Sequence, residues 1–240
     1  MKLAIMQPYF FPYIGYWQLM GCVDTFVIYD DVNFIKGGWI NRNKILLNGK
    51  ERYVNLPMLG ISPNKQINEV MINRDRKELN HTLNLIKEAY RGAPYFNDVY
   101  QMIIEIFNSV EETASGFIAD SFRFVCLYLG IKTNRILSSK MDKNISLKGE
   151  AKVIDICERL KADEYINPIG GMIIYKDDSF SEKGVKLKFL KTNNIVYNQN
   201  GNSFIPNLSI IDVMMFNSRE SVMNMLNDYK LVTSNENMWG

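Results

Sequence analysis

The chain has 240 residues, of which 28 are basic and 26 acidic, giving a formal net charge of +2. This balance, with Lys and Arg scattered along the chain, disfavours a general nucleic-acid or membrane-surface binder. No segment approaches the roughly 18 apolar residues of a membrane span. The apolar opening is broken by Gln7 and Pro8 before a signal-peptide core is complete. Cys22, Cys126 and Cys157 are odd in number and widely spaced, which indicates neither disulfides nor zinc. We expect a cytoplasmic protein.

The first elements form a predicted βαβ unit. Residues 2–6 are an apolar run that ends before Pro8, which is typical of a strand. Pro8 and Pro12 predict an extended loop, because proline restricts both itself and the residue before it. Apolar spacing over 14–22 predicts a short helix, and residues 26–29 (FVIY) predict a second strand. The unit implies parallel strands with a right-handed crossover.

A hairpin and a helical block are predicted next. Asn48–Gly49 separates two apolar runs within 44–57, which is a strong hairpin signal. Residues 69–72 (EVMI) predict a further strand. Three helices are then expected, at 75–90, 95–110 and 115–129.

Parallel-sheet signals return after Gly130. Strands are predicted at 135–138, 164–167 and 185–190, with a helix over 149–160 and one or two helices within 208–228. A helical insertion inside a parallel sheet accounts for this order better than two independent domains. We therefore expect one α/β domain over residues 1–240, with a mostly parallel Rossmann-like sheet and a helical insertion at about 75–130.

The segment QPYFFPYIGYW, residues 7–17, is the first candidate binding element. It places aromatic residues, including Tyr9, in a loop at the carboxyl end of the first strand, where ligands bind in open α/β sheets. Gly15 lets a ligand or another chain approach the backbone closely. The alternative is that these aromatic side chains fill the core, but that does not account for the polar Gln7.

Polar residues follow the second strand. Asp30 and Asp31 predict a site for a metal, ribose hydroxyls or an amine, or alternatively a helix or turn cap. In the string WINRN, Arg42 and Asn43 are candidates for substrate binding. A guanidinium suits a phosphate or carboxylate, although a surface salt bridge is the alternative for Arg42. His81 is the single histidine and a candidate acid–base group, although most lone helical histidines are structural or exposed.

Two later loops follow predicted strands and so should reach the same crevice. Ser138, Ser139 and Lys140 form a turn that can hold a phosphate. Asn167 begins the loop that contains Gly170 and Gly171, where the backbone can approach a ligand.

Together these motifs resemble the WbqC-like protein family. The resemblance rests on MQPYFFPYIGYWQLM, VDTFVIYDDVNF, GWINRN, HTLNLIKEAYRGAPYF, ILSSK, YINPIGG with Tyr175, and FIPNLSIIDVMMFN, and it runs from Met1 to about Asn217. It implies a place in bacterial gene clusters for O-antigen and other surface polysaccharides. It further implies transfer of glycine, or a related acyl group, to an amino sugar.

A looser resemblance concerns the fold. The strand, proline-containing loop, glycine at the helix start and Asp-bearing second strand resemble the nucleotide-binding opening of class I aminoacyl-tRNA synthetases and pantothenate synthetase. Those enzymes place two histidines around the glycine, whereas this chain has Ile14–Gly15–Tyr16–Trp17. The departure disfavours adenylation chemistry of the usual kind.

The favoured hypothesis is an N-acyltransferase acting on a nucleotide-linked amino sugar. A neutral amine would attack an activated carbonyl, with His81 or Asp31 as general base. The residues expected to bind substrates are Gln7, Tyr9, Gly15, Asp30, Arg42, Asn43, Ser138, Ser139, Lys140, Asn167, Gly170 and Gly171. The donor stays open among an aminoacyl thioester, an aminoacyl-tRNA, and an amino acid with ATP. The alternatives are an ATP-dependent ligase and a non-catalytic sugar-nucleotide-binding module. No transition metal is expected, whereas Mg²⁺ could accompany a substrate phosphate at Asp30 or Asp31.

Overall fold

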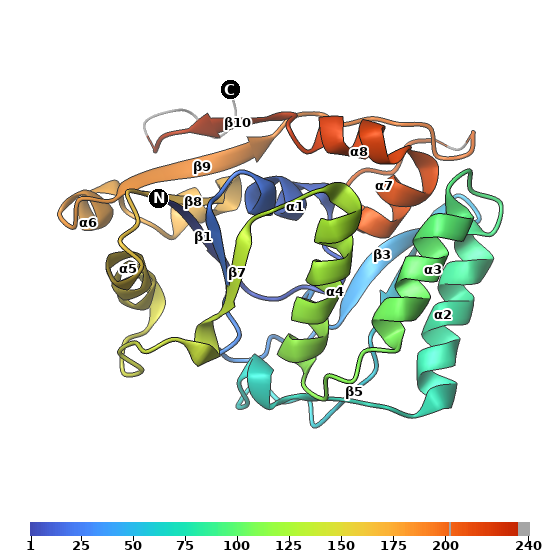
Figure 1. Ribbon diagram of the computed structural model, residues 1–240, viewed down its shortest axis with the longest axis horizontal. Helices are drawn as coiled ribbons and strands as arrows, with labels where there is room; N and C mark the ends of the chain where they lie inside the picture. Colours follow the sequence, from blue (N-terminus) through green and yellow to red (C-terminus); the bar gives the residue numbers. More distant parts are fainter. Residues whose placement is uncertain (202, 235–240) are drawn as a thin grey trace.

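The computed structural model describes residues 1–201 and 203–234. Its central strands are β1 Lys2–Met6, β2 Thr25–Ile28, β7 Asn134–Leu137, β8 Glu164–Pro168, β9 Lys186–Thr192 and β10 Tyr229–Val232. Within this part of the chain they form a six-stranded sheet in the order β10-β9-β8-β1-β2-β7 (Figure 1). Every neighbouring pair is parallel except β10 and β9. The predicted mostly parallel, Rossmann-like α/β sheet is confirmed.

The first two strands are parallel neighbours, as the sequence predicts. Leu3 lies opposite Thr25 and Met6 opposite Ile28. Both strands are apolar runs because a parallel sheet is covered on both faces. Strand β10 was not predicted. It is a short antiparallel edge strand that follows two helices. Its sequence carries no strong strand pattern, and it is extended because it pairs with β9.

The two faces of the sheet pack into separate cores, because successive side chains of a strand point to opposite faces. Ala4 and Phe26 belong to the larger core, under helices α1 and α4. Leu3 and Val27 belong to the smaller core, under helices α5 and α6. The bounds of these helices are α1 Ile14–Gly21, α4 Ala114–Leu129, α5 Gly149–Arg159 and α6 Asp177–Ser181.

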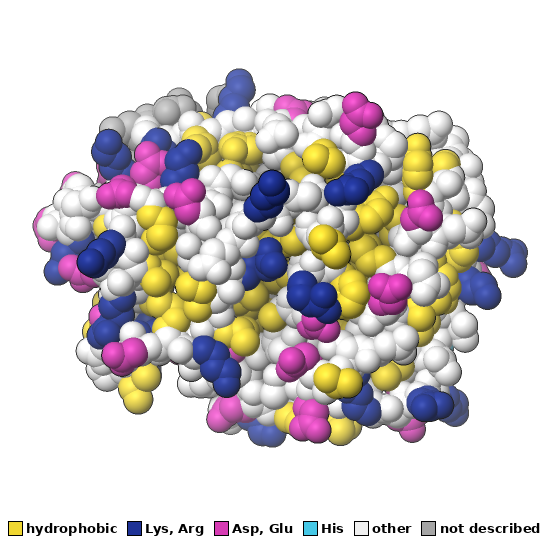
Figure 2. Space-filling view, in the orientation of Figure 1, with side chains coloured by type: hydrophobic (Ala, Val, Ile, Leu, Met, Phe, Trp, Pro, Cys, Tyr) yellow, Lys and Arg dark blue, Asp and Glu magenta, His cyan; other side chains and the backbone are white. Residues whose placement is uncertain are grey.

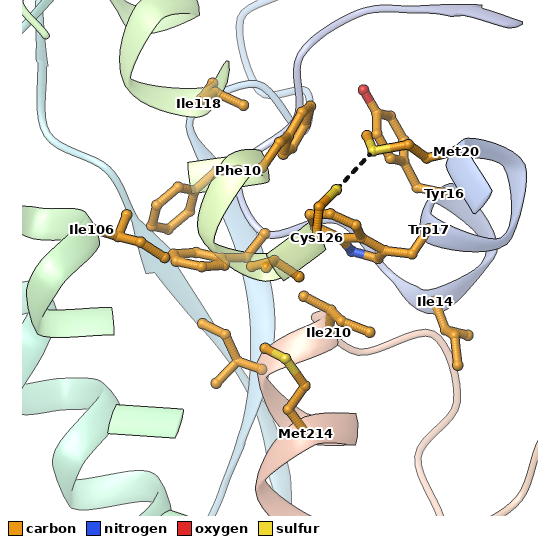
Figure 3. Close-up of a cluster of buried hydrophobic side chains, with 14 of the residues drawn as sticks. Phe10, Ile14, Tyr16, Trp17, Met20, Ile106, Ile118, Cys126, Ile210 and Met214 are labelled. Atoms are coloured by element: carbon orange, nitrogen blue, oxygen red, sulfur yellow. Dashed lines mark hydrogen bonds between the residues drawn. The ribbon is translucent and has the colours of Figure 1, made fainter. Parts of the chain in front are cut away.

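The helical block predicted between β2 and β7 is present. It consists of α2 Arg76–Tyr90, α3 Phe96–Phe107 and α4. The carboxylate of Asp75 accepts the backbone N–H groups of Lys77 and Glu78 and so caps α2. Gly130 ends α4 in the left-handed conformation, with φ of 71°. Side chains of all three helices share the larger core with α1 and the sheet, as Figure 3 shows for Ile106, Ile118 and Trp17.

The predicted hairpin is also present, as β3 Arg42–Leu47 and β4 Lys50–Asn55. Asn48 and Gly49 both have positive φ, 52° and 71°, as a type I′ turn requires. The strand expected over 69–72 is wrong in its first half. The Gln66 N–H donates to Glu69 Oε2 at 2.7 Å, which holds the 3₁₀ turn η1 Ile67–Glu69. Only β6 Met71–Ile72 is extended, and it pairs with β5 Met58–Leu59.

The remaining elements are short. They are the 3₁₀ turns η2 Ser138–Lys140 and η3 Ile169–Ile173, and the helices α7 Ile210–Phe216 and α8 Arg219–Met225. Helices α7 and α8 lie inside the predicted range 208–228. In the described residues, none of the helices has the length and apolar character needed to cross a membrane. On the face seen in Figure 2, Lys and Arg are scattered among acidic side chains rather than gathered in a basic patch.

Candidate functional site

The candidate site is the crevice outside the carboxyl ends of β1 and β8. From β1 the chain passes through α1 to β2, and from β8 it passes through α6 to β9 on the other side. Helices α1 and α6 cover opposite faces of the sheet. The two loops therefore diverge and leave a crevice between them. This is the topological switch point, where ligands bind in open α/β sheets.

A cleft of about 440 Å³ opens at this switch point, and we call it the switch-point cleft. It is lined by Met6, Tyr9, Pro12, Tyr13, Trp39, Asn43, Pro168 and Asn207. None of these described lining residues carries a charge. Aromatic faces with a few amides and hydroxyls are typical of small-molecule sites and provide stacking surfaces for a flat or ring-shaped ligand.

The aromatic loop after β1 divides between core and cleft. Phe10, Phe11 and Trp17 are fully buried, and Figure 3 shows Phe10 and Trp17 among apolar side chains of three other elements. Tyr9 and Tyr13 are half-buried and line the cleft. Phe10, Phe11 and Trp17 therefore fill the core, as the alternative interpretation stated. Tyr9 and Tyr13 remain accessible to a ligand.

Asn43 fixes the shape of this loop. Phe11 has φ of 41°, a region that residues with side chains rarely adopt. Its carbonyl oxygen accepts from Asn43 Nδ2 at 2.8 Å and from Ser209 Oγ at 2.8 Å. Asn43 Nδ2 also donates to the Phe10 carbonyl at 3.0 Å. Strained backbone of this kind persists only where the surroundings hold it. Asn43 thus contributes a wall of the cleft and commits its amide N–H groups to the loop.

Gly15 allows close packing beside the cleft. A Cβ at this position would lie 2.5 Å from Tyr13 Cε2 and 2.7 Å from Thr192 Oγ1. The predicted close approach at Gly15 therefore involves this chain's own side chains. It lets the Tyr13 ring lie against α1 and near β9.

The two tyrosine hydroxyls stay protonated at neutral pH. Burial raises the pKa of Tyr9, and burial together with the nearby Tyr9 raises the pKa of Tyr13. Both groups can therefore donate a hydrogen bond to a ligand, but neither is a base.

Asp30 and Ser139 are brought together at the ends of β2 and β7. Asp30 is fully buried and accepts from Ser139 N at 2.8 Å and from Ser139 Oγ at 2.7 Å. The carboxylate therefore caps the turn η2, as the alternative interpretation of the paired aspartates proposed. The Ser139 N–H and hydroxyl were expected to bind a phosphate, but here they donate to Asp30. Lys140, the third residue of this turn, is exposed.

Asp31 lies in a buried charge cluster. It accepts from Ser138 Oγ at 2.5 Å, and its Oδ2 lies 3.0 Å from Lys143 Nζ and 2.9 Å from Lys152 Nζ. Both lysines are buried. Sequence reasoning missed them. The available signal was Lys152, which shares the apolar face of the predicted helix 149–160 with Ile156.

The cluster makes Asp31 a weak proton acceptor. Burial acts to raise the pKa of Asp31, but hydrogen bonds from Ser138, Lys152 and Lys143 outweigh it, and the pKa lies below its ordinary value. The two ammonium groups at this carboxylate also disfavour the binding of a metal cation. Across the described residues, His, Cys, Asp and Glu form no group of three or more that could hold a metal ion.

Arg42 orders the loop that carries Trp39. Its guanidinium donates to the carbonyls of Gly37 and Gly38 and lies 4.6 Å from the centroid of the Tyr53 ring. Trp39 is 41% exposed and lines the cleft. Arg42 thus acts on the cleft through the loop, and it is not itself part of the lining.

Gln7 carries an unpartnered acceptor at the carboxyl end of β1. Its Oε1 is buried and has no hydrogen-bond partner. A buried amide oxygen of this kind gains free energy when a donor reaches it. Gln7 is absent from the cleft lining, although the adjacent residues Met6 and Tyr9 belong to it.

The loop after β8 is shaped by one asparagine and one glycine. Asn167 is buried and donates to the Tyr165 hydroxyl at 2.7 Å. A Cβ on Gly171 would overlap Asn167 Oδ1, so the glycine allows this packing. Gly170 is exposed with open space around it. The neighbouring Pro168 is the residue of this loop that lines the cleft.

His81 lies apart from these groups. It is exposed on α2, beside Glu51 and Tyr53 of the hairpin. The pockets that it lines contain none of Gln7, Asp31 or Ser139. His81 therefore lies away from those residues, because α2 packs against the hairpin rather than at the carboxyl ends of the central strands. We assign His81 no catalytic role.

The three cysteines are free and poorly suited to nucleophilic chemistry. Burial raises the pKa of Cys22 and of Cys126 to about 11 and that of Cys157 to about 12. A thiol at neutral pH is a much weaker nucleophile than a thiolate.

The fold and this crevice define an α/β protein with an open, mostly parallel sheet and an aromatic cleft at its switch point. Residues 7–224 match the model of the WbqC-like protein family, so the chain belongs to that family. It is similar to the "Uncharacterized protein Rv1507c" of Mycobacterium tuberculosis (strain ATCC 25618 / H37Rv), with 25% identity over 216 residues. That similarity covers 89% of this chain and 92% of the relative. No solved structure matches the chain.

Proposed function

We propose that the switch-point cleft binds a nucleotide-linked amino sugar and that the protein transfers a glycyl or related acyl group to the sugar amine. The observation that carries this proposal is the aromatic lining of a cleft of about 440 Å³ at the point where α/β sheets bind ligands, because such a lining suits the sugar and base rings of this ligand. Tyr9, Tyr13 and Trp39 offer faces on which a sugar or a base can stack. Membership of the WbqC-like family supports a role in surface-polysaccharide biosynthesis.

The groups at the cleft suit stabilisation of an oxyanion better than removal of a proton. The described lining contains no carboxylate or imidazole, and Asp31 is held by two lysines elsewhere. The sugar amine would therefore enter as the neutral base and attack the activated carbonyl directly. The Tyr9 hydroxyl would donate to the oxygen on which negative charge develops.

A single-turnover assay tests this function. The protein would be mixed with a nucleotide-linked amino sugar and activated glycine donors, and the amide product detected by mass spectrometry. We expect Tyr9→Phe to lower the rate about 10²–10³-fold, as loss of an oxyanion donor does. Tyr100→Phe is the matched control, since that hydroxyl bonds to Leu83 O inside the helical block. Equal rates for Tyr9→Phe and the wild type would remove the proposed role of the hydroxyl.

A non-catalytic sugar-nucleotide-binding module is the second candidate. The observation that favours it is the same lack of an ionisable acid or base in the described cleft lining. Tight binding of the nucleotide sugar without product from any donor would establish this candidate in place of the transferase. Pyrophosphate release with ATP would instead favour a ligase. The turn expected to bind phosphate gives that alternative little support, because Ser138 and Ser139 already donate to Asp31 and Asp30.

A further inference from the structure

A second cleft of about 280 Å³ lies beside the first, and we call it the strap cleft. The name refers to the irregular segment between β9 and α7, which supplies much of its wall. Asn207 lines both clefts. Ile14 of the strap cleft directly follows Tyr13 of the switch-point cleft, and the Tyr13 ring packs near Thr192, another residue of the strap cleft. The two clefts thus meet at Tyr13 and Asn207.

The strap cleft is held in shape by a buried carboxylate, Asp212 of α7. Asp212 is fully buried and accepts from the Tyr197 hydroxyl at 2.7 Å and from Gln199 Nε2 at 2.9 Å. The Tyr90 hydroxyl of α2 donates to its other oxygen at 2.8 Å. Gln199 also exchanges hydrogen bonds with the backbone of Ile205, at 3.0 and 2.8 Å. This network ties the segment to two helices, so the cleft exists before any ligand arrives.

The lining indicates the chemistry of a ligand. It combines apolar side chains such as Ile195 and Phe204 with the amides of Asn193 and Asn194 and the hydroxyl of Thr192. No Lys or Arg belongs to the described lining. A neutral chain that bears amide groups has both apolar and hydrogen-bonding partners.

We propose that the strap cleft is the donor site and holds the pantetheine arm of an acyl thioester. The inference rests on the proposed function and names its donor class. A pantetheine arm is an uncharged chain with two amides that ends in the reacting sulfur. With its thioester end at Tyr13 and Asn207, the acyl carbonyl faces the switch-point cleft. The sugar nitrogen forms a bond to the carbonyl carbon, the carbon–sulfur bond breaks, and the departing thiolate takes up the proton released by nitrogen.

The test measures donor and acceptor binding separately. Asn194 is exposed and lines the strap cleft, so Asn194→Trp would obstruct the cleft without altering the core. Asn224→Trp adds the same side chain at an exposed position of α8 outside both clefts. The probes are S-acetyl-pantetheine, acetyl-coenzyme A and an acetylated carrier protein, each titrated against the protein by NMR without sugar nucleotide. Thermal unfolding would confirm that both variants are folded.

We expect S-acetyl-pantetheine to bind the wild type and Asn224→Trp alike, and Asn194→Trp at least about tenfold more weakly, or about 1.4 kcal/mol. The nucleotide sugar should bind all three proteins equally. The coenzyme A and carrier-protein probes show which source of the arm is used. Equal thioester affinity for Asn194→Trp and the wild type, no thioester binding, or displacement of the thioester by the nucleotide sugar would each overturn the assignment.

The donor site and the proposed function can fail independently. Thioester binding that depends on Asn194, with no amide product from any acceptor, would keep the donor site and remove the transferase function. Product formed from an aminoacyl-tRNA but not from a thioester would keep the function and remove the pantetheine assignment.

Discussion

Asn43 Nδ2 donates to the carbonyl oxygen of Phe11 at 2.8 Å, and Phe11 is the residue of the binding loop with a left-handed backbone. The two residues lie far apart in sequence, in the hairpin and in the loop after β1. Their contact therefore links the position of the hairpin to the shape of the switch-point cleft.

Replacing Asn43 with Ala should lower both stability and ligand binding. The Phe10 carbonyl loses its donor, and an unsatisfied buried group costs roughly 1–3 kcal/mol. The free energy of unfolding, measured in urea, should fall by that amount, and nucleotide-sugar affinity should fall with it. Asn84→Ala, on the exposed face of α2, is the control. Unchanged values for Asn43→Ala would show that the loop keeps its shape without the amide.

Gly15 and Gly21 offer a matched pair of substitutions within α1. A Cβ on Gly15 would press on Tyr13 and Thr192, whereas nothing lies within 4 Å of a Cβ on Gly21. We expect Gly15→Ala to destabilise by about 1–3 kcal/mol through overpacking and to weaken ligand binding. Gly21→Ala should do neither. Thermal unfolding and ligand titration of the two variants make the comparison, and equal behaviour would contradict the packing described for Tyr13.

The Asp31 cluster predicts a defined pH dependence of stability. The folded-state pKa of Asp31 lies below its ordinary value, so the ionised carboxylate stabilises the fold at neutral pH. That contribution is complete above the unfolded-state pKa of about 3.9 and is lost as pH falls through the folded-state pKa. Asp31→Asn leaves Lys143 and Lys152 buried without a negatively charged partner, which should cost roughly 3–5 kcal/mol at pH 7.

Chemical denaturation from pH 7 down to about pH 3 measures this difference. The difference in the free energy of unfolding between the wild type and Asp31→Asn should become smaller at low pH, because protonation of Asp31 removes the same charge from the wild type. Asp142→Asn, at an exposed position, should give no such difference. A difference that stays constant at all pH values would show that the lysines are not paired with Asp31.

The sequence predicted the first βαβ unit, the hairpin, the central strands other than β10 and the helices other than α6, because these depend on local apolar runs and turn residues. Asn48–Gly49 is the clearest case, since the dipeptide alone dictates its turn. The sequence also placed Asp30, Asp31, Ser138 and Ser139 at one crevice, because parallel strands end at one edge of a sheet. It did not predict that the serines would donate hydrogen bonds to the aspartates.

Long-range packing was not predictable in the same way. Trp39, Tyr13 and Asn207 meet at one cleft only through the fold, and no local pattern marks Asn207. Lys143 and Lys152 are buried because they pair with Asp31, which lies over 100 residues earlier in the sequence. His81 was predicted as a catalytic group from its chemistry alone, whereas the structure places it on α2, which the hairpin separates from the crevice.

We accordingly expect His81→Ala to leave turnover and ligand binding unchanged. His81 is exposed, and such surface substitutions usually alter the free energy of unfolding by less than about 0.5 kcal/mol. Steady-state kinetics of the variant beside Tyr9→Phe makes the measurement. A large loss of turnover in His81→Ala, with folding intact, would return the histidine to the active site.

The central claim is that the switch-point cleft binds the nucleotide sugar, and calorimetric titration of Trp39→Ala tests it most directly. Trp39 is 41% exposed and lines the cleft, so its removal takes away a stacking face without opening the core. Leu127→Ala, at a side chain 73% exposed on α4, is the control. Loss of one stacking contact should weaken binding by about 1–3 kcal/mol, whereas Leu127→Ala should bind as the wild type does. Wild-type affinity in Trp39→Ala would place the ligand elsewhere and contradict the account.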